Sequence, residues 1–303
     1  MPELVVPGVA DAARIAAVIN ARSQALHGVT EESADGVVRW FALPSLDPAS
    51  DMRLAVGADG EPLGYADVGG PDAGGPKAYV DLRTGPDADA LQLLFAWAEG
   101  RAAERAGAGG VVHFFVDEKD TELRELLADE GYASIRSSYE MERGLEGELE
   151  PPTWPDGLNP RAFSVEDAEA VFAAQEEAFA DHWGFEPGTF ESWRAYNLAE
   201  TEDPSLWRIV WDGDEIAGLC VNRPARGEDS TVGWVGSLAV RRPWRRRGLG
   251  EALLRDAFVR FAERGKRSAG LGVDAENTTG AVALYERVGM HVVRRSDTWE
   301  RAV

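Results

Sequence analysis

The stretch "PWRRRGLGEALL", Pro243–Leu254, places three arginines directly before a Gly-x-Gly. The preceding residues, "TVGWVGSLAV" at Thr231–Val240, are mostly apolar or β-branched and predict a strand. After the glycines, apolar residues recur at the spacing of an amphipathic helix, at Leu249, Leu253, Leu254, Ala257, Phe258 and Phe261. The arginines and glycines therefore lie at a strand-to-helix turn, where unpaired backbone N–H groups and the positive end of the helix dipole favour an anion such as a phosphate.

Two common phosphate-binding sequences do not match this turn. A nucleoside-triphosphate loop ends in Gly-Lys-Ser/Thr, which the stretch lacks, and the dinucleotide fingerprint needs a third glycine where Leu253 stands. Gly248 and Gly250 let the backbone approach an anion closely, although a Gly-x-Gly by itself also occurs in ordinary tight turns.

The composition argues against several classes of protein. A net charge of −22 disfavours a nucleic-acid partner, which requires a basic face, and no run of eighteen apolar residues predicts a membrane span. The first residues lack the pattern of an export signal, and a single cysteine, Cys220, suits a reducing compartment, so a cytoplasmic location is expected. No metal is expected, because the four histidines, His27, His113, His182 and His291, have no ligand spacing.

The chain repeats itself at a spacing of about 157 residues. "GVADAARIAAVINA" (Gly8–Ala21) matches "SVEDAEAVFAAQEE" (Ser164–Glu177), and "ADEGYASIRSSYEMER" (Ala128–Arg143) matches "ERVGMHVVRRSDTWER" (Glu286–Arg301). Each half also holds an Asp-Gly turn between two apolar runs, which predicts a hairpin. A segment near Pro151, rich in proline, glycine and acidic residues, separates the halves. We therefore expect two α+β domains, residues 1–150 and 151–303, each a mixed sheet flanked by helices.

The second half resembles the GNAT family of N-acetyltransferases. "LAVRRPWRRRGLGEALL" is similar to the family's acyl-CoA motif, a strand followed by Arg/Gln-x-x-Gly-x-Gly/Ala and a helix, with Arg245, Gly248 and Gly250 at the three diagnostic positions. Further along, "ENTTGAVALYERVGM" is similar to the family's second signature, with Met290 in place of the usual Phe. The tandem arrangement also resembles two-domain members of the family that acetylate a cysteinyl amine.

The resemblance implies direct transfer of an acetyl group from acetyl-CoA to an amine. The diphosphate would bind the N–H groups of residues 246–251 beside the guanidinium of Arg245, and the pantetheine arm would lie along the strand like an added strand. Tyr285 would be the general acid that protonates the departing thiolate, unless it only packs on a helix face. The cofactor-binding residues would be Leu238, Ala239, Val240, Arg245, Arg246, Arg247, Gly248, Leu249, Gly250, Glu251 and Asn277, the last of which could instead cap a helix.

The sequence identifies no general base. Members of the family often carry a glutamate on the strand before the motif, but residues 234–237 offer no carboxylate, and a weak base or water could suffice. Glu177 and His182 fall where the family's substrate-binding helices would be, and both are expected to be surface residues. Cys220 is expected to be a small buried apolar residue on a strand, because no base partner for it is recognisable.

The first half lacks the phosphate-binding turn. When the long helices of the two halves are aligned, "PDADAL" (Pro86–Leu91) falls on "RRRGLG" (Arg245–Gly250), so two aspartates take the place of the cradle and would repel a diphosphate. Leu127 falls on Tyr285, which removes the hydroxyl as well. The first half is therefore expected to be a degenerate domain that kept the fold and lost the chemistry.

The leading hypothesis is an acetyl-CoA-dependent N-acetyltransferase acting on a primary amine of a small molecule. The alternatives are an enzyme for a cysteinyl amine, one for the amines of peptides or proteins, and a non-catalytic acyl-CoA-binding protein. The protein would be a monomer or a homodimer.

Overall fold

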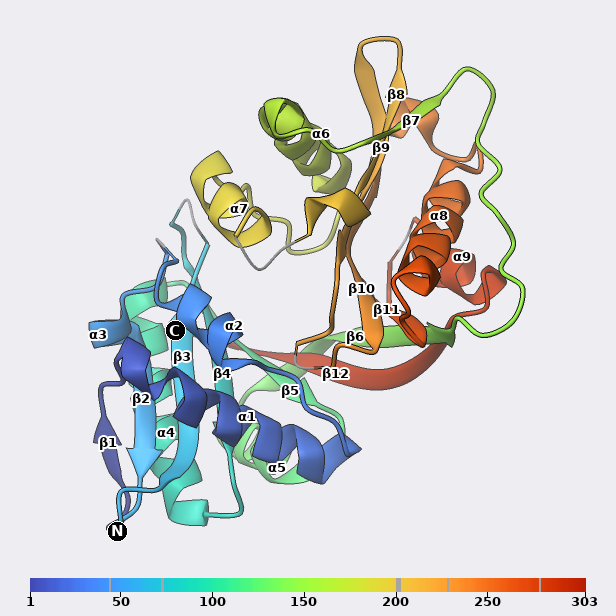
Figure 1. Cartoon of the computed structure of the whole chain (residues 1–303). Helices are drawn as coiled ribbons and strands as arrows, with labels where there is room; N and C mark the ends of the chain where they lie inside the picture. The colour runs from blue at the N-terminus through green and yellow to red at the C-terminus, as the bar shows by residue number, and fades with distance from the viewer. Residues whose placement is uncertain (44, 72–73, 200–202, 228, 278) are drawn as a thin grey trace. The chain divides into compact units, whose positions relative to one another are not determined.

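The computed structural model describes residues 1–43, 45–71, 74–199, 203–227, 229–277 and 279–303 (Figure 1). They form two compact units. Unit 1 comprises Met1–Ser137, Gly227–Asp229 and Arg295–Val303, and unit 2 comprises Ser138–Arg226 and Ser230–Arg294. No helix in the described ranges is long and apolar enough to cross a membrane.

Unit 1 is a mixed sheet with the spatial order β1-β2-β3-β4-β5-β12, in which β4 and β5 are parallel. The strands are β1 (Glu3–Val5), β2 (Met52–Val56), β3 (Pro62–Gly69), β4 (Lys77–Thr84), β5 (Val111–Asp117) and the end of β12 (His291–Ala302). The helices are α1 (Ala12–His27), α2 (Ala34–Trp40), α3 (Pro48–Asp51), α4 (Ala88–Ala106) and α5 (Thr121–Asp129).

Unit 2 repeats this plan with the order β6-β11-β10-β9-β8-β7, in which β10 and β11 are parallel. Figure 1 shows α6 and α7 on one face of this sheet and α8 and α9 on the other. The strands are β6 (Ala133–Gly144), β7 (Asn159–Ala162), β8 (Arg208–Asp212), β9 (Glu215–Arg223), β10 (Val232–Val240) and β11 (Ser268–Asp274), and the helices are α6 (Ala168–Phe179), α7 (Phe190–Asn197), α8 (Leu249–Glu263) and α9 (Ala281–Arg287). The predicted α+β class with a mixed sheet in each half is confirmed.

Each half of the sequence contributes its last strand to the unit that is built mainly from the other half. Residues 138–144 of β6 pair with β11 in unit 2, and residues 296–302 of β12 pair with β5 in unit 1. The domain boundary near Pro151 was predicted from the composition of the linker, and it stays a prediction.

The apolar face of α8 fixes the helix closely against the sheet of unit 2. Its buried residues include Leu253, Phe258 and Phe261, each of which contributes about 1.5–3 kcal/mol when fully buried. Glycines in the strands allow this approach: a Cβ at Gly233 would lie 2.3 Å from the ring of Phe261, and one at Gly218 would lie 3.1 Å from Leu249. This packing positions the first turn of α8 next to the end of β10.

Candidate active site

The turn before α8 has a left-handed backbone at two positions. Arg245 is extended, with φ −64° and ψ 156°, whereas Arg246 has φ 63° and Gly248 has φ 84°. Arg246 is the one non-glycine residue with positive φ in the part of the chain that the structure describes. Such a conformation is uncommon for a residue with a side chain and occurs where a functional site requires it.

This turn leaves a row of backbone donors available. The N–H of Ala252 donates to the carbonyl of Gly248 at 3.0 Å, but among the described residues the N–H groups of residues 246–251 have no hydrogen-bond partner. These donors lie at the positive end of the α8 dipole. The predicted strand-to-helix turn with unpaired N–H groups is therefore present.

The three arginines of the turn have different roles. The guanidinium of Arg245 donates to the carbonyls of Val240 and Ala178 at 2.9 Å each and to Asp181 at 3.2 Å. It thus ties β10 to the end of α6, and its expected contact with a diphosphate stays a prediction. Arg246 and Arg247 are exposed and form no ion pair within the described residues, so their charges are available.

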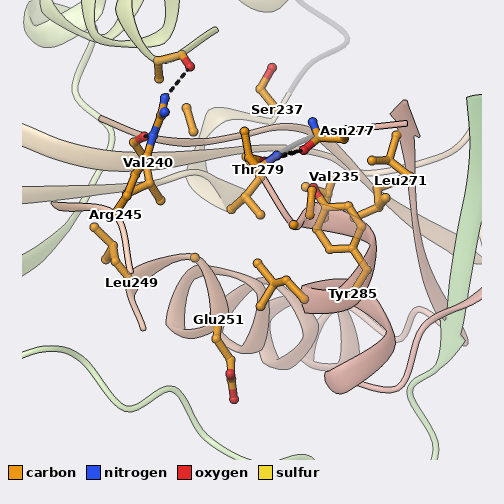
Figure 2. Close-up of a pocket in the computed structure, with 18 of the residues that line it drawn as sticks. Val235, Ser237, Val240, Arg245, Leu249, Glu251, Leu271, Asn277, Thr279 and Tyr285 are labelled. Atoms are coloured by element: carbon orange, nitrogen blue, oxygen red, sulfur yellow. Dashed lines mark hydrogen bonds between the residues drawn. The ribbon is translucent and has the colours of Figure 1, made fainter. Parts of the chain in front are cut away.

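A pocket of about 440 Å³ extends from this turn into unit 2 (Figure 2). Arg247 is the predicted cofactor-binding residue that does not line it. The others do: Leu238, Ala239, Val240, Arg245, Arg246, Gly248, Leu249, Gly250, Glu251 and Asn277. Figure 2 shows the side chain of Glu251 pointing away from the other labelled residues, and its carboxylate accepts from Arg255, so the backbone of Glu251 is what faces the pocket.

The pocket opens where β10 and β11 diverge. Their parallel pairing runs from Val232 with Ser268 to Val235 with Leu271, and the register of β10 against β9 shifts between Val235 and Ser237. Beyond this bulge, residues 237–240 and 272–274 line the pocket. The edge of β10 can therefore pair with an extended ligand as it would with another strand.

Tyr285 projects from α9 toward Val235 at the inner part of the pocket (Figure 2). The residue is only 8% exposed, and its hydroxyl forms no hydrogen bond with any described residue. Burial, with a smaller effect of the neighbouring Cys220, raises the pKa of Tyr285 above its ordinary value. The phenol therefore stays protonated near neutral pH and can donate a proton.

Asn277 orders a turn and does not cap α9, whose N-cap is Gly280 with no side-chain hydrogen bond. Its side-chain oxygen accepts the N–H of Thr279 at 2.8 Å and the hydroxyl of Thr279 at 2.5 Å, which orders the turn before α9. It also lines the pocket, and its contact with a cofactor stays a prediction.

The other titratable residues considered from the sequence differ in whether they line the pocket. Glu177 accepts from Arg241 at 2.7 Å and does not line the pocket. His182 lines the pocket with its ring 4.6 Å from that of Phe179, and burial followed by the charge of Arg245 lowers its pKa. It is therefore a half-buried residue in the wall of the pocket. Cys220 is buried, as expected, and burial raises the pKa of its thiol.

The helix of unit 1 that corresponds to α8 is α4, and a side chain caps its N-terminus. The carboxylate of Asp87 accepts the N–H of Ala90 at 2.8 Å and caps α4. Leu127, which falls on Tyr285 in the alignment, is completely buried. No cluster of three His, Cys, Asp or Glu side chains that could hold a metal occurs among the described residues of either unit.

Sequence reasoning missed the outer walls of the site. Ala178 and Phe179 at the end of α6 line the pocket, as do Thr279 and Gly280 before α9. Motif spacing could not reveal them, because they come from segments distant in sequence that meet only when the sheet forms.

Known proteins share this fold and sequence. The Acetyltransferase (GNAT) family matches residues 168–290. The mycothiol acetyltransferase of Salinispora arenicola is 30% identical over 270 residues, covering 87% of this chain and 78% of that protein. That of Geodermatophilus obscurus is 29% identical over 268 residues, 82% of each chain.

Solved structures agree. A GCN5-related N-acetyltransferase from Sphaerobacter thermophilus has a TM-score of 0.79 at 34% identity and covers 99% of this chain and 95% of that one. A tandem GNAT protein from the clavulanic acid biosynthesis pathway has a TM-score of 0.76 at 15% identity, covering 100% and 98%, and supports the fold alone.

The fold and its pocket thus define an acyltransferase of the acyl-CoA-dependent type. The chain belongs to the GNAT family of acetyltransferases and contains two GNAT-like folds in tandem. It is an acyl-CoA-dependent N-acetyltransferase.

Proposed function

We propose that this enzyme transfers the acetyl group of acetyl-CoA to the primary amine of a small molecule, at one site in unit 2. The observation that carries the proposal is the continuity of the pocket. It begins at the unpaired N–H groups of residues 246–251, follows the free edge of β10 and ends at the hydroxyl of Tyr285.

Each part of acetyl-CoA has a matching part of this pocket. The diphosphate would bind the N–H groups at the start of α8, with the charges of Arg246 and Arg247 beside it. The pantetheine arm would pair with Leu238–Val240, and the thioester would then lie near the bulge at Gly236. Arg245 would hold the turn in place through Val240 and Ala178.

The chemistry is a direct attack of the neutral amine on the thioester carbonyl. A C–N bond forms, the C–S bond breaks, and the phenol of Tyr285 donates its proton to the departing sulfur. The amine loses a proton to water or to a weak base on the acceptor side. No carboxylate stands at residues 234–237 of β10 to do this.

A second candidate follows from the curated relatives. Two of them are named mycothiol acetyltransferases, the enzymes also called mycothiol synthases, so the acceptor of this chain could be a cysteinyl amine. A peptide or protein amine is a further alternative, and a non-catalytic acyl-CoA-binding role would be the outcome if no amine is acetylated. The single cysteine suits a cytoplasmic location.

The test is a panel of amines assayed for release of free CoA from acetyl-CoA. It includes amino acids, amino sugars, polyamines, the cysteinyl precursor of mycothiol and a lysine-containing peptide. Turnover with a small amine and none with the peptide supports the proposal. Turnover with the peptide alone, or tight binding of acetyl-CoA with no turnover on any amine, would contradict it.

A further inference from the structure

Arg223 lies on the face of the unit 2 sheet that is turned away from α8. Gly233 faces α8, because a Cβ there would meet Phe261, so the next residue, Trp234, faces the other way. Arg223 on β9 pairs directly with Trp234, and paired residues project to the same face. Tyr196 of α7 contacts Arg223 on this face.

Tyr196 holds Arg223 in place, but only part of the guanidinium is hydrogen-bonded to described residues. Its Nη1 donates to the hydroxyl of Tyr196 at 2.9 Å, and the guanidinium lies 4.2 Å from the centre of the Tyr196 ring. Its Nε is buried and has no hydrogen-bond partner among the described residues. The Cβ that any other residue would carry at position 236 would lie only 3.2 Å from this Nε. Because Gly236 lines the pocket, the unused edge of Arg223 lies beside the bulge.

The unused edge is the one that binds carboxylates side-on. Nε and Nη2 form a planar fork that matches the two oxygens of a carboxylate. The same edge of Arg208 holds Asp256 in this way, with distances of 3.0 and 3.1 Å. In Arg223 only Nη1 is hydrogen-bonded to a described residue, so the Nε–Nη2 edge has no partner there; its Nε is buried behind Gly236, and Arg223 itself does not line the pocket.

Arg223 also differs from the neighbouring arginines in its partners, because those arginines lie close to glutamates. Arg226 lies 3.5 Å from Glu140 and from Glu142, and Arg294 lies 3.7 Å from Glu140. The one hydrogen bond that Arg223 donates to a described side chain goes to the neutral Tyr196, and Arg223 forms no ion pair with a described residue. A guanidinium with a buried, unsatisfied N–H and no acidic partner favours a ligand that supplies an anion.

We propose that Arg223, oriented by Tyr196, binds a carboxylate of the acceptor, and that the acceptor is an amino carboxylate such as an amino acid. The carboxylate occupies the Nε–Nη2 fork beside Gly236, and the amine of the same molecule reaches the thioester at the bulge. This inference rests on the proposed function, because it assigns the substrate class of the same pocket. Arg223 is a specificity-determining residue and takes no part in proton transfer.

The experiment compares amino acids with their carboxamides, which lack the carboxylate, and refers each kcat/KM to the neutral form of the amine, because the amine of a carboxamide is less basic. Release of CoA from acetyl-CoA is measured for the wild type and for Arg223→Met and Arg223→Lys. Arg161→Met is the control, because Arg161 also lies over an aromatic ring, Trp211 at 5.4 Å, but on the edge strand β7 away from the pocket. Calorimetric titration of the same compounds into the CoA complex measures binding without turnover.

We expect the wild type to favour an amino acid over its amide by about ten- to hundredfold in kcat/KM, the range for a lost charge-assisted hydrogen bond. Arg223→Met abolishes that preference by lowering kcat/KM for the amino acid to the level of its amide. Arg223→Lys restores part of the preference, because it keeps the charge without the fork, and Arg161→Met behaves as wild type. Unfolding midpoints identify any variant that has lost its fold. If Arg223→Met is such a variant, Arg223→Lys is compared with the wild type instead.

The possible failures are distinguishable. Equal rates for acids and amides in the wild type, or an unchanged preference in Arg223→Met, would overturn the inference and leave the proposed acetylation of a small amine intact. Absence of turnover on every amine, with amino acids still binding the CoA complex in an Arg223-dependent way, would refute the proposed function and support the carboxylate site. Arg223-independent binding together with no turnover would remove both.

Discussion

Replacing Gly248 by aspartate and, separately, by asparagine tests whether the diphosphate binds at the start of α8. Gly248 is the N-cap of α8 with φ 84°, and no described atom outside its chain neighbours lies within 4 Å of its Cβ position. Asparagine and aspartate are nearly equal in size, and both tolerate the left-handed region better than other side chains. The two variants therefore share their backbone cost and differ by one negative charge.

That charge has a calculable effect on a bound diphosphate. At about 5 Å, one charge repels the two charges of a diphosphate by roughly 1.7 kcal/mol in a water-like medium and by about four times as much at an effective dielectric constant of 20. Since about 1.4 kcal/mol corresponds to a factor of ten, Gly248→Asp should bind acetyl-CoA at least about tenfold more weakly than Gly248→Asn. Raising the salt concentration should reduce the difference.

The assay is calorimetric titration of both variants with acetyl-CoA and with acetyl-pantetheine, which lacks the diphosphate. We expect a difference between the variants for acetyl-CoA and none for acetyl-pantetheine. Unfolding midpoints serve as the control, because an aspartate at an N-cap stabilises a helix and the Asp variant should be no less stable than the Asn variant. Equal affinities of the two variants for acetyl-CoA would refute the placement of the diphosphate at this turn.

Three further outcomes are expected. Tyr285→Phe should lower kcat by about a hundredfold with little change in the affinity for acetyl-CoA, because only proton donation is lost; full activity in a steady-state assay would remove Tyr285 from the mechanism. Calorimetry should find one acetyl-CoA site per chain, because Asp87 caps the matching helix of unit 1, and two sites of similar affinity would contradict this. His182 has a pKa lowered by burial and by Arg245, so below its unfolded pKa of about 6.5 the unfolded chain binds more protons than the folded one. The wild type should therefore lose more stability than His182→Gln as the pH falls through 6.5 toward the folded pKa. Parallel unfolding midpoints of the two proteins at pH 7.5 and 5.5 would show that His182 is not held neutral.

The parts of the site that sequence could predict are local ones. The turn at Arg245–Gly250, the apolar face of α8 and the position of Tyr285 on a helix follow from residue spacing over a few turns of chain, and the structure has these elements where they were expected. The roles of Tyr285 and of the cofactor-binding residues remain predictions.

Contacts between segments that are distant in the sequence could not be predicted from it. The guanidinium of Arg245 binds the carbonyl of Ala178, 67 residues away, and a backbone carbonyl has no signature in the sequence. The open fork of Arg223 depends on a glycine on the next strand and on Tyr196 of another helix. The pairing of β6 with β11 joins residues from opposite halves of the repeat, which a boundary drawn by composition could not foresee.

The two halves of the chain begin the matching helix in different ways, and we propose that this difference decides which half binds an anion. In unit 1 the carboxylate of Asp87 satisfies the first turn of α4. In unit 2 the N-cap of α8 is a glycine, and no side chain among the described residues caps the helix. Relative to a glycine N-cap, a capping side chain stabilises a helix by only about a few tenths of a kcal/mol, so α8 lacks little stability that α4 has. Those same N–H groups are satisfied when a diphosphate binds, and a ligand that binds only the folded state stabilises it. We propose that the unpaired N–H groups at the start of α8 and its capacity to bind acyl-CoA have one cause, the absence of a side chain at Gly248.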